Sequence, residues 1–300
     1  MCRLAAFPPG FARDRALEIL LRFEGPNTDG VGAAYVKNGK FQIEKSPMSI
    51  SEVLESGHNF LGHMGPECKS WTIAHLRLAS HGCNHMRNTH PFIVGDYCVV
   101  HNGVWSNYST AKGILKKVPM PDGSARKFEG ETDTEVAAHL LQFVGPEDFT
   151  TELDYGGVFL ALKRDGDLWA CKVSGDLEVS KRKSGAFLMA STLDQNKFKN
   201  KYEAKRGCYH FDVEGKLLSA TEKPGYSSTN YSNSNYSRSG WDNDDDYGYQ
   251  SRGSSSMCSF PKQQTSSNPS TSTTPETTPR YTPMSLKEIE EYLEQGWKQK

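Results

Sequence analysis

Long apolar runs are missing from this sequence of 300 residues. No stretch of about 18 apolar residues occurs, so we expect no membrane-spanning helix and no membrane partner. The first 24 residues also lack the apolar middle of a secretory signal peptide, because Pro8, Pro9 and Gly10 interrupt it together with nearby charged residues. These absences predict a soluble chain without a secretory leader.

The chain also has no marked excess of positive or negative charge. The chain has 35 Lys and Arg residues against 36 Asp and Glu residues, a formal net charge of −1. Electrostatics therefore indicates no nucleic-acid partner. The seven cysteines are odd in number and show no paired spacing, so they fit a reducing cytoplasm better than a disulfide framework.

Aliphatic residues disappear from one long segment. Between Gly225 and Pro283 there is no Val, Ile, Leu or Ala, while Ser, Thr and Asn make up 28 of the 59 residues. Such a segment cannot bury enough apolar area to offset the entropy lost on ordering. We predict a disordered linker over residues 223–283, which leaves one domain over residues 2–222.

A short apolar pattern follows this linker. Ser285 and Glu288 have the spacing of a helix-capping pair, and apolar residues then recur at helical spacing, namely Leu286, Ile289, Leu293 and Trp297. This pattern predicts an amphipathic helix over residues 284–298. The helix either docks on a partner or folds back onto its own domain, and the sequence leaves both alternatives open.

Short β-type runs dominate the first 222 residues. Asn38-Gly39 separates two of them and predicts a hairpin with a tight turn. Further strands are expected over residues 71–78, 97–101, 158–162, 168–173, 186–189 and 208–213, and helices over 13–23, 51–56 and 133–143. Strands that arrive in hairpins rather than alternating with helices indicate antiparallel sheets with helices packed outside them.

Cys2 is a candidate nucleophile. Met1 precedes a small residue, which is the context in which the initiator methionine is removed. Removal would place a thiol and a free α-amine on one residue, and the unperturbed pKa of that amine is about 7.7 to 8.0. The thiolate could then attack while the amine serves as the base, directly or through a water. A cysteine at position 2 is weak evidence by itself.

Four later segments strengthen the case for Cys2. In chain order they are His75-Leu76-Arg77-Leu78-Ala79-Ser80-His81-Gly82, Asn88-Thr89-His90-Pro91-Phe92, Val99-Val100-His101-Asn102-Gly103-Val104 and Glu131-Thr132-Asp133-Thr134-Glu135. Behind a Met-Cys start, they closely resemble the class II glutamine amidotransferases, as in the glutaminase domain of glucosamine-6-phosphate synthase. The resemblance covers roughly residues 2 to 220. It implies an α+β fold, a four-layer αββα sandwich of two antiparallel sheets of the N-terminal nucleophile hydrolase type.

The resemblance also implies residues that hold glutamine. Arg77 would bind the α-carboxylate, a task suited to the two parallel hydrogen bonds of a guanidinium group. Asp133 would bind the α-ammonium, although an acid in the first turn of a helix is also favoured by the helix dipole. Ser80, which stands where the family usually has Thr, and His81 would line the glutamine pocket.

Amide cleavage further requires donors for the negative charge that develops on the carbonyl oxygen. The resemblance implies that the Asn102 side chain and the backbone N–H of Gly103 supply them. Gly103 would let the backbone approach the substrate, which a Cβ could obstruct. The implied reaction is attack of Cys2 on the glutamine side-chain amide, release of ammonia, and hydrolysis of the γ-glutamyl thioester to glutamate.

Three positions depart from the usual family pattern. Arg3 stands where Gly commonly follows the nucleophile, Leu76 replaces Thr, and Leu78 replaces Trp. Loss of the Trp removes an aromatic wall, so another γ-glutamyl amide is an alternative substrate for a stand-alone hydrolase. A second alternative is a non-catalytic domain that senses glutamine or acts as a scaffold.

Metal-ligating residue types crowd one segment, where His75, His81, Cys83, His85 and His90 fall within 16 residues. Zinc sites usually show paired ligands such as Cys-x-x-Cys, and none occurs here. We therefore expect no metal and no cofactor.

No acceptor module follows the expected domain. Residue 222 is succeeded by the aliphatic-poor segment, and no Gly-rich phosphate loop is present. We therefore expect a separate ligase or synthase to receive the ammonia. The helix over residues 285–297 would help to hold this partner, and the tether of about 60 flexible residues before it would raise the effective concentration of the partner.

Overall fold

The computed structural model describes residues 2–80, 82–120, 122–153 and 156–223. The predicted helix over 284–298 and all but the first residue of the predicted linker over 223–283 lie outside these residues, as do Met1 and His81. The described helices are α1 (Arg13–Glu24), α2 (Ile50–Glu55), the 3-10 helix η1 (Met86–Asn88), α3 (Tyr108–Leu115), α4 (Asp133–Val144) and α5 (Pro146–Glu152). Within the described ranges, every helix falls short of the length and apolarity that a bilayer crossing requires.

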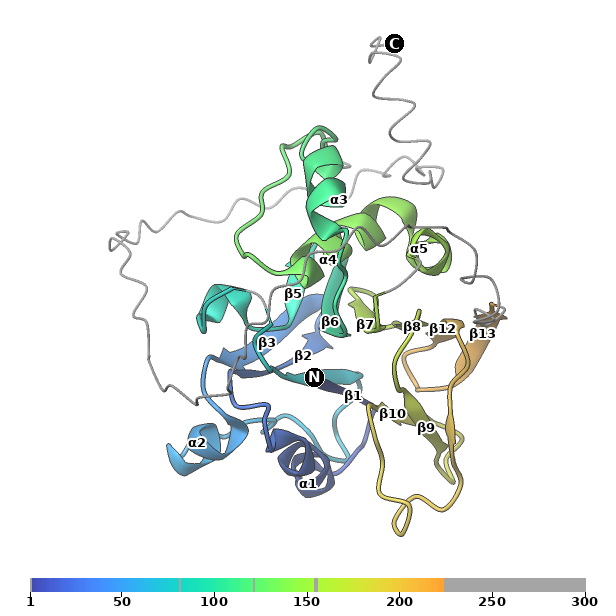
Figure 1. The fold of residues 1–300 in the computed structure, drawn as a ribbon. Coiled ribbons are helices and arrows are strands. Elements are labelled where there is room, and N and C mark those ends of the chain that lie inside the picture. The colour runs from blue at the N-terminus through green and yellow to red at the C-terminus, as the bar shows by residue number, and fades with distance from the viewer. Residues whose placement is uncertain (1, 81, 121, 154–155, 224–300) are drawn as a thin grey trace, which may run out of the picture. The chain divides into compact units, whose positions relative to one another are not determined.

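The described strands form two antiparallel sheets (Figure 1). The seven-stranded sheet has the order β11-β9-β10-β1-β4-β2-β3, with β1 (Arg3–Phe7), β2 (Val31–Lys37), β3 (Lys40–Ser46), β4 (Thr72–Leu76), β9 (Glu178–Lys181), β10 (Phe187–Ala190) and β11 (Lys201–Glu203). The six-stranded sheet has the order β13-β12-β8-β7-β6-β5, with β5 (Phe92–Val94), β6 (Tyr97–Asn102), β7 (Val158–Lys163), β8 (Leu168–Lys172), β12 (Gly207–Phe211) and β13 (Leu217–Glu222).

Three apolar cores separate four layers, because successive side chains of a strand point to opposite faces. In β1, Ala5 and Phe7 pack toward α1 and α2, whereas Leu4 and Ala6 pack between the sheets. The outer face of the six-stranded sheet packs against α3, α4 and α5. Figure 1 shows the resulting order of helices, sheet, sheet and helices. The predicted αββα sandwich is therefore confirmed.

The hairpin predicted at Asn38-Gly39 is present. Asn38 and Gly39 have φ angles of 52° and 68°, the left-handed values that a tight turn between β2 and β3 requires. The turn between β7 and β8 likewise joins paired neighbours. Every other predicted strand and helix of the first 222 residues also occurs, with ends shifted by a few residues.

Thr132 and Glu135 have the spacing of a capping box at the start of α4, but only half of that box is formed. The Thr132 hydroxyl accepts a hydrogen bond from the Glu135 backbone N–H at 3.4 Å. The Glu135 carboxylate does not return to Thr132 but accepts from the backbone N–H groups of Glu129 and Gly130, at 2.6 and 2.9 Å. Glu135 therefore holds the loop that leads into the helix, and Asp133 becomes the first helical residue.

Candidate active site

Cys2 lies at the start of the central strand of the seven-stranded sheet. Strand β1 pairs with β4 in a register that places Arg3 opposite Leu76, so Cys2 reaches the segment that continues from β4. Its Sγ donates to the Leu78 carbonyl oxygen and accepts from the Leu78 N–H, both at 3.3 Å. Burial raises the pKa of the Cys2 thiol, against the opposing effects of the Leu78 hydrogen bond and the Arg77 charge. The thiol therefore needs a base before it can attack.

Arg77 and Asp133 bring opposite charges to the pocket that contains Cys2. Arg77 is 2% exposed, and its guanidinium donates to the carbonyl oxygens of Gly82 and Cys83 at 3.4 and 3.3 Å. Asp133 is 7% exposed, and its Oδ2 accepts from the Trp105 backbone N–H at 2.8 Å. A carboxylate and a guanidinium in one small pocket suit a zwitterionic ligand.

The predicted site residues largely come together. Cys2, Arg77, Ser80, Gly103 and Asp133 all line this pocket. Asn102 precedes Gly103 at the end of β6 and is buried. His81 lies outside the described residues. The other residues that line the pocket are Leu78, His90, His101, Thr132 and Thr134.

Gly103 is required for a backbone contact that the sequence did not reveal. A Cβ on Gly103 would lie 2.3 Å from the Gly156 carbonyl oxygen and 2.7 Å from the Gly157 Cα. A Cβ on Gly157 would in turn lie 2.2 Å from the Asn102 carbonyl oxygen. The expectation that Gly103 is needed for room beside the substrate therefore misses this reason, which is the close packing of two chain segments behind the pocket.

Three buried histidines cluster at the pocket, where His90 and His101 line it and His75 lies against His90. The rings of His75 and His90 have centroids 3.8 Å apart. The Thr134 hydroxyl lies between His90 Nε2, at 2.7 Å, and His101 Nδ1, at 3.0 Å. His75 Nε2 is 2.9 Å from the His101 carbonyl oxygen, and His101 Nε2 bonds to the Gly156 carbonyl oxygen. The two bonds to carbonyl oxygens require protonated Nε2 atoms on His75 and His101.

Burial keeps these histidines neutral. Burial, with smaller contributions from neighbouring His101 and Arg77, lowers the pKa of His75 to about 3. Burial also lowers the pKa of His90 and of His101, although Asp133 acts in the opposite direction on His101. With neutral imidazoles around it, the Asp133 carboxylate has no imidazolium as its counter-ion and remains available to a cationic group of a ligand.

Metal-ligand geometry is not seen around these histidines. Across the residues that the structure describes, no three His, Cys, Asp or Glu side chains gather as a metal site would require. His85, one of the crowded residues in the sequence, caps η1 by accepting from the Arg87 N–H at 3.1 Å. His75 and His90 bond to a carbonyl oxygen and to a hydroxyl, as described above.

Thr134 and Ser191 contact predicted site residues although no sequence signal assigned them a role. Thr134 is part of the Glu-Thr-Asp-Thr-Glu segment, but that motif gave its hydroxyl no task. Ser191 follows β10, and its Oγ accepts from Asn102 Nδ2 at 3.1 Å. No local pattern marks Ser191, because it is 89 residues from Asn102 in the chain.

Known proteins resemble this chain in sequence and in fold. No family model matches the chain. It is 36% identical over 149 residues to the glutamine–fructose-6-phosphate aminotransferase of Aquifex aeolicus, covering 47% of this chain and 22% of the relative. It is 31% identical over 199 residues to the enzyme of the same name from Caulobacter vibrioides, covering 63% of this chain and 31% of the relative. The chain thus spans about a fifth to a third of the length of these curated relatives.

Two solved structures share the fold. The glutamine phosphoribosylpyrophosphate amidotransferase of B. subtilis superimposes with a TM-score of 0.55 at 19% identity, covering 74% of this chain and 49% of that chain. A structure described as the allosteric regulatory enzyme of purine biosynthesis gives a TM-score of 0.56 at 20% identity, covering 72% of this chain and 48% of that chain. At these identities the likeness supports the sandwich architecture alone.

Proposed function

We propose that this chain, which belongs to the class II glutamine amidotransferases, hydrolyses the side-chain amide of glutamine to glutamate and ammonia. The observation that carries the proposal is the position of Cys2 Sγ in a buried pocket with the opposite charges of Arg77 and Asp133. These charges match the α-carboxylate and α-ammonium of an amino acid. The relatives whose names include glutamine support this choice of substrate.

In the proposed mechanism, removal of Met1 frees the α-amine of Cys2. The amine takes the thiol proton, the sulfur forms a bond to the amide carbon, and the carbonyl oxygen becomes negatively charged. Asn102 Nδ2 and the Gly103 N–H donate to that oxygen. The amide C–N bond then breaks, and the ammonium of Cys2 returns the proton to the leaving nitrogen. A water molecule hydrolyses the thioester and releases glutamate.

Ammonia release by purified protein tests this function. Wild-type chain is expected to release ammonia from glutamine, and Cys2→Ala is expected to release none above background. Cys68→Ala is the matched control, since Cys68 is also a half-buried free thiol that donates to a backbone carbonyl, at 3.4 Å. Active protein whose intact mass still includes Met1, or an active Cys2→Ala variant, would overturn the mechanism.

Another γ-glutamyl amide is the second candidate substrate. Leu78, which stands where the family usually has Trp, lines the pocket and contacts Cys2 through its backbone. A side chain smaller than Trp at this position would allow a group larger than the amide of glutamine. Ammonia or amine release from glutamine and from γ-glutamyl dipeptides, compared by kcat/KM, separates the two substrates. A higher value for a dipeptide would assign the stand-alone hydrolase.

Delivery of the ammonia to a separate ligase or synthase is part of the proposal. We place both proteins in the cytoplasm, where the six free cysteines of the described residues would stay reduced. The test compares the full chain with a chain that ends at Lys223. An amide-forming enzyme is expected to use glutamine in the presence of the full chain and to lose this ability with the shortened one. Equal support by both chains would exclude a role for residues 224–300.

A further inference from the structure

Ser191 links the two sheets at the candidate site. It follows β10, the strand beside β1, and is 1% exposed. Its Oγ accepts from the Leu4 backbone N–H at 3.0 Å and from Asn102 Nδ2 at 3.1 Å. Leu4 lies two residues after Cys2 in the seven-stranded sheet, whereas Asn102 ends β6 in the six-stranded sheet. One hydroxyl therefore ties the strand of the nucleophile to the predicted oxyanion donor.

The hydroxyl itself is held firmly in place. The Ser191 backbone N–H donates to the Leu4 carbonyl oxygen at 2.9 Å, so Ser191 is joined to Leu4 by two hydrogen bonds. The Ser191 oxygen accepts two hydrogen bonds, and these two bonds use both of its lone pairs. The position of Asn102 Nδ2 is thus defined relative to β1, the strand that positions Cys2.

The chemistry of the Asn102 amide gives this contact a purpose. An amide nitrogen carries two hydrogens, and the bond to Ser191 uses one of them. Asn102 Oδ1 is buried and, within the described ranges, has no hydrogen-bond partner. Among the described residues, the contact with Ser191 is therefore the hydrogen bond that fixes the plane of the amide. Without this contact the amide plane could rotate, and the second N–H would no longer point in one fixed direction, as a preorganised donor must.

We propose that Ser191 is a positioning residue that holds the Asn102 amide so that its second N–H is directed at the substrate carbonyl oxygen. The inference rests on the proposed function. Ser191 does not touch the reacting atoms and acts through Asn102 alone. It should therefore affect the chemical step more than substrate binding, because the charge on the oxygen develops only in the transition state.

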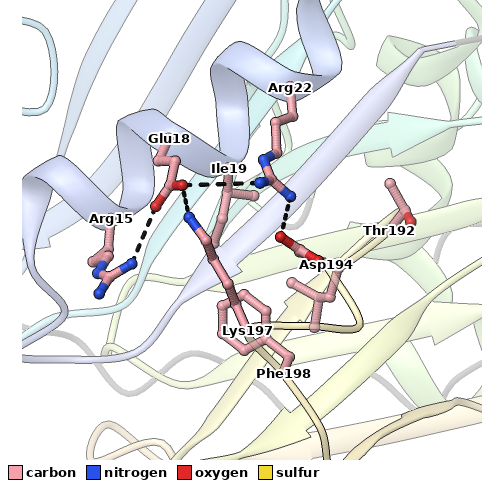
Figure 2. Close-up of a pocket in the computed structure, with 9 residues that line it drawn as sticks. Arg15, Glu18, Ile19, Arg22, Thr192, Asp194, Lys197 and Phe198 are labelled. Atoms are coloured by element: carbon pink, nitrogen blue, oxygen red, sulfur yellow. Dashed lines mark hydrogen bonds and ion pairs between the residues drawn. The ribbon is translucent and has the colours of Figure 1, made fainter.

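Surface ion pairs fasten the segment that follows Ser191 to α1 (Figure 2). Asp194 Oδ2 lies 2.6 Å from Arg22 Nη1, and Lys197 bonds to Glu18. The Arg22 side chain is 49% exposed, so this ion pair contributes little to stability. We infer that the bonds to Leu4, rather than these ion pairs, position Ser191. Asp194→Asn therefore serves as a control that perturbs the neighbouring segment without touching the hydroxyl.

Steady-state kinetics of Ser191→Ala test the proposal. We expect kcat to fall about tenfold, between the effect of one neutral hydrogen bond and the loss of a whole oxyanion donor, with KM within about twofold of wild type. Ser191→Thr, which keeps the hydroxyl, should recover most of kcat. Ser180→Ala is the matched control, because Ser180 is a buried serine in β9, on the far side of β10 from β1. Ser180→Ala and Asp194→Asn should leave kcat unchanged.

A double-mutant cycle separates positioning from a merely structural role. In an Asn102→Ala background, Ser191→Ala should lower kcat by less than about twofold, since no amide remains to be positioned. A further tenfold loss in that background, or a change in KM with constant kcat, would overturn the proposal.

Nuclear magnetic resonance provides a readout that needs no turnover. One side-chain amide hydrogen of Asn102 should exchange slowly with solvent in wild type and rapidly in Ser191→Ala. Fast exchange of both hydrogens in wild type would overturn the inference even if the enzyme were active. Slow exchange in a protein that cleaves no γ-glutamyl amide would leave the Ser191 contact established and refute the proposed function instead.

Discussion

Strand ends build one wall of the candidate pocket, and connecting segments build the other. The sheet wall comprises Cys2 and Gly103, and Asn102 is buried beside Gly103 at the end of β6. Strand pairing and backbone packing against Gly156 and Gly157 hold this wall. The residues of the sheet wall are therefore held in place by the same hydrogen bonds that hold the sheets together. These residues include the ones that could take part in the reaction.

The loop wall comprises Arg77, Ser80 and Asp133, which follow β4 or begin α4. The Arg77 guanidinium rests on two loop carbonyl oxygens, and Ser80 is exposed. This difference assigns the walls to different tasks. Under the proposed function, the sheet wall would fix the geometry of bond making, and the loop wall would recognise the ends of the substrate. Changes in the sheet wall should affect folding and kcat, whereas changes in the loop wall should affect KM.

Acidic pH should lower the stability of the sheet wall more than that of the loop wall, because His75, His90 and His101 are buried next to the sheet wall. Their pKa values are lower in the folded protein than in the unfolded chain, so the unfolded chain binds more protons below about pH 6.5. Stability is therefore present above pH 6.5 and is lost as the pH falls toward 3. His75 alone should cost about 2 kcal/mol between pH 6.5 and 5, with His90 and His101 acting in the same direction.

Denaturant unfolding at several pH values measures this loss. His85→Gln is the control from the loop side, since His85 is exposed, and it should leave the pH dependence unchanged. A free energy of unfolding that is constant between pH 6.5 and 5 would contradict the burial of neutral histidines.

Gly103→Ala should disrupt the backbone packing of the sheet wall. The added Cβ would overlap the Gly156 carbonyl oxygen and the Gly157 backbone, which should destabilise the fold by about 3 kcal/mol and abolish activity. Gly113→Ala is the matched control, because its Cβ meets nothing within 4 Å on helix α3. That change should stabilise the protein by up to about 1 kcal/mol. Equal melting temperatures for the two variants would refute the close approach.

Asp133→Asn should act on the loop wall without disturbing the structure. The new amide oxygen can still accept from the Trp105 N–H, which now donates to Asp133 Oδ2. Loss of the charge should raise KM about 30-fold, the value of a hydrogen bond to a charged group, with kcat nearly constant. Glu129→Gln removes an exposed charge outside the pocket and should leave KM unchanged. A fall in kcat at constant KM would reassign Asp133 to the chemical step.

Glu131→Gln should have the smallest effect. Glu131 bonds to Arg87 at 2.9 Å and to Asn88 at 3.1 Å, and it fastens the loop that Arg77 contacts. Its side chain is 49% exposed, so stability should change by less than about 1 kcal/mol. Asp165→Asn breaks an ion pair of similar exposure in the turn between β7 and β8. In parallel glutaminase assays, Glu131→Gln should raise KM about threefold, whereas Asp165→Asn should leave KM unchanged.

Local signals were sufficient for much of the fold. The Asn38-Gly39 turn and the alternation around it predicted a hairpin that the structure contains. Strand β1 was not predicted, because it is buried on both faces and its apolar residues do not alternate with polar ones. The Thr132–Glu135 spacing alone does not determine the cap of α4, since the preceding loop offers Glu135 a second set of backbone donors.

The sequence by itself determined the sheet-rich architecture and, through the resemblance of its four motif segments to a known family, the candidate residues Cys2, Arg77, Asn102 and Asp133, because each motif is contiguous in the chain. Only the tertiary structure decided that Ser191 meets Asn102, that Gly103 is packed against Gly157, and that three histidines are neutral. These features join segments tens of residues apart, and burial, which sets the protonation of the histidines, is a property of the folded layers rather than of any local pattern.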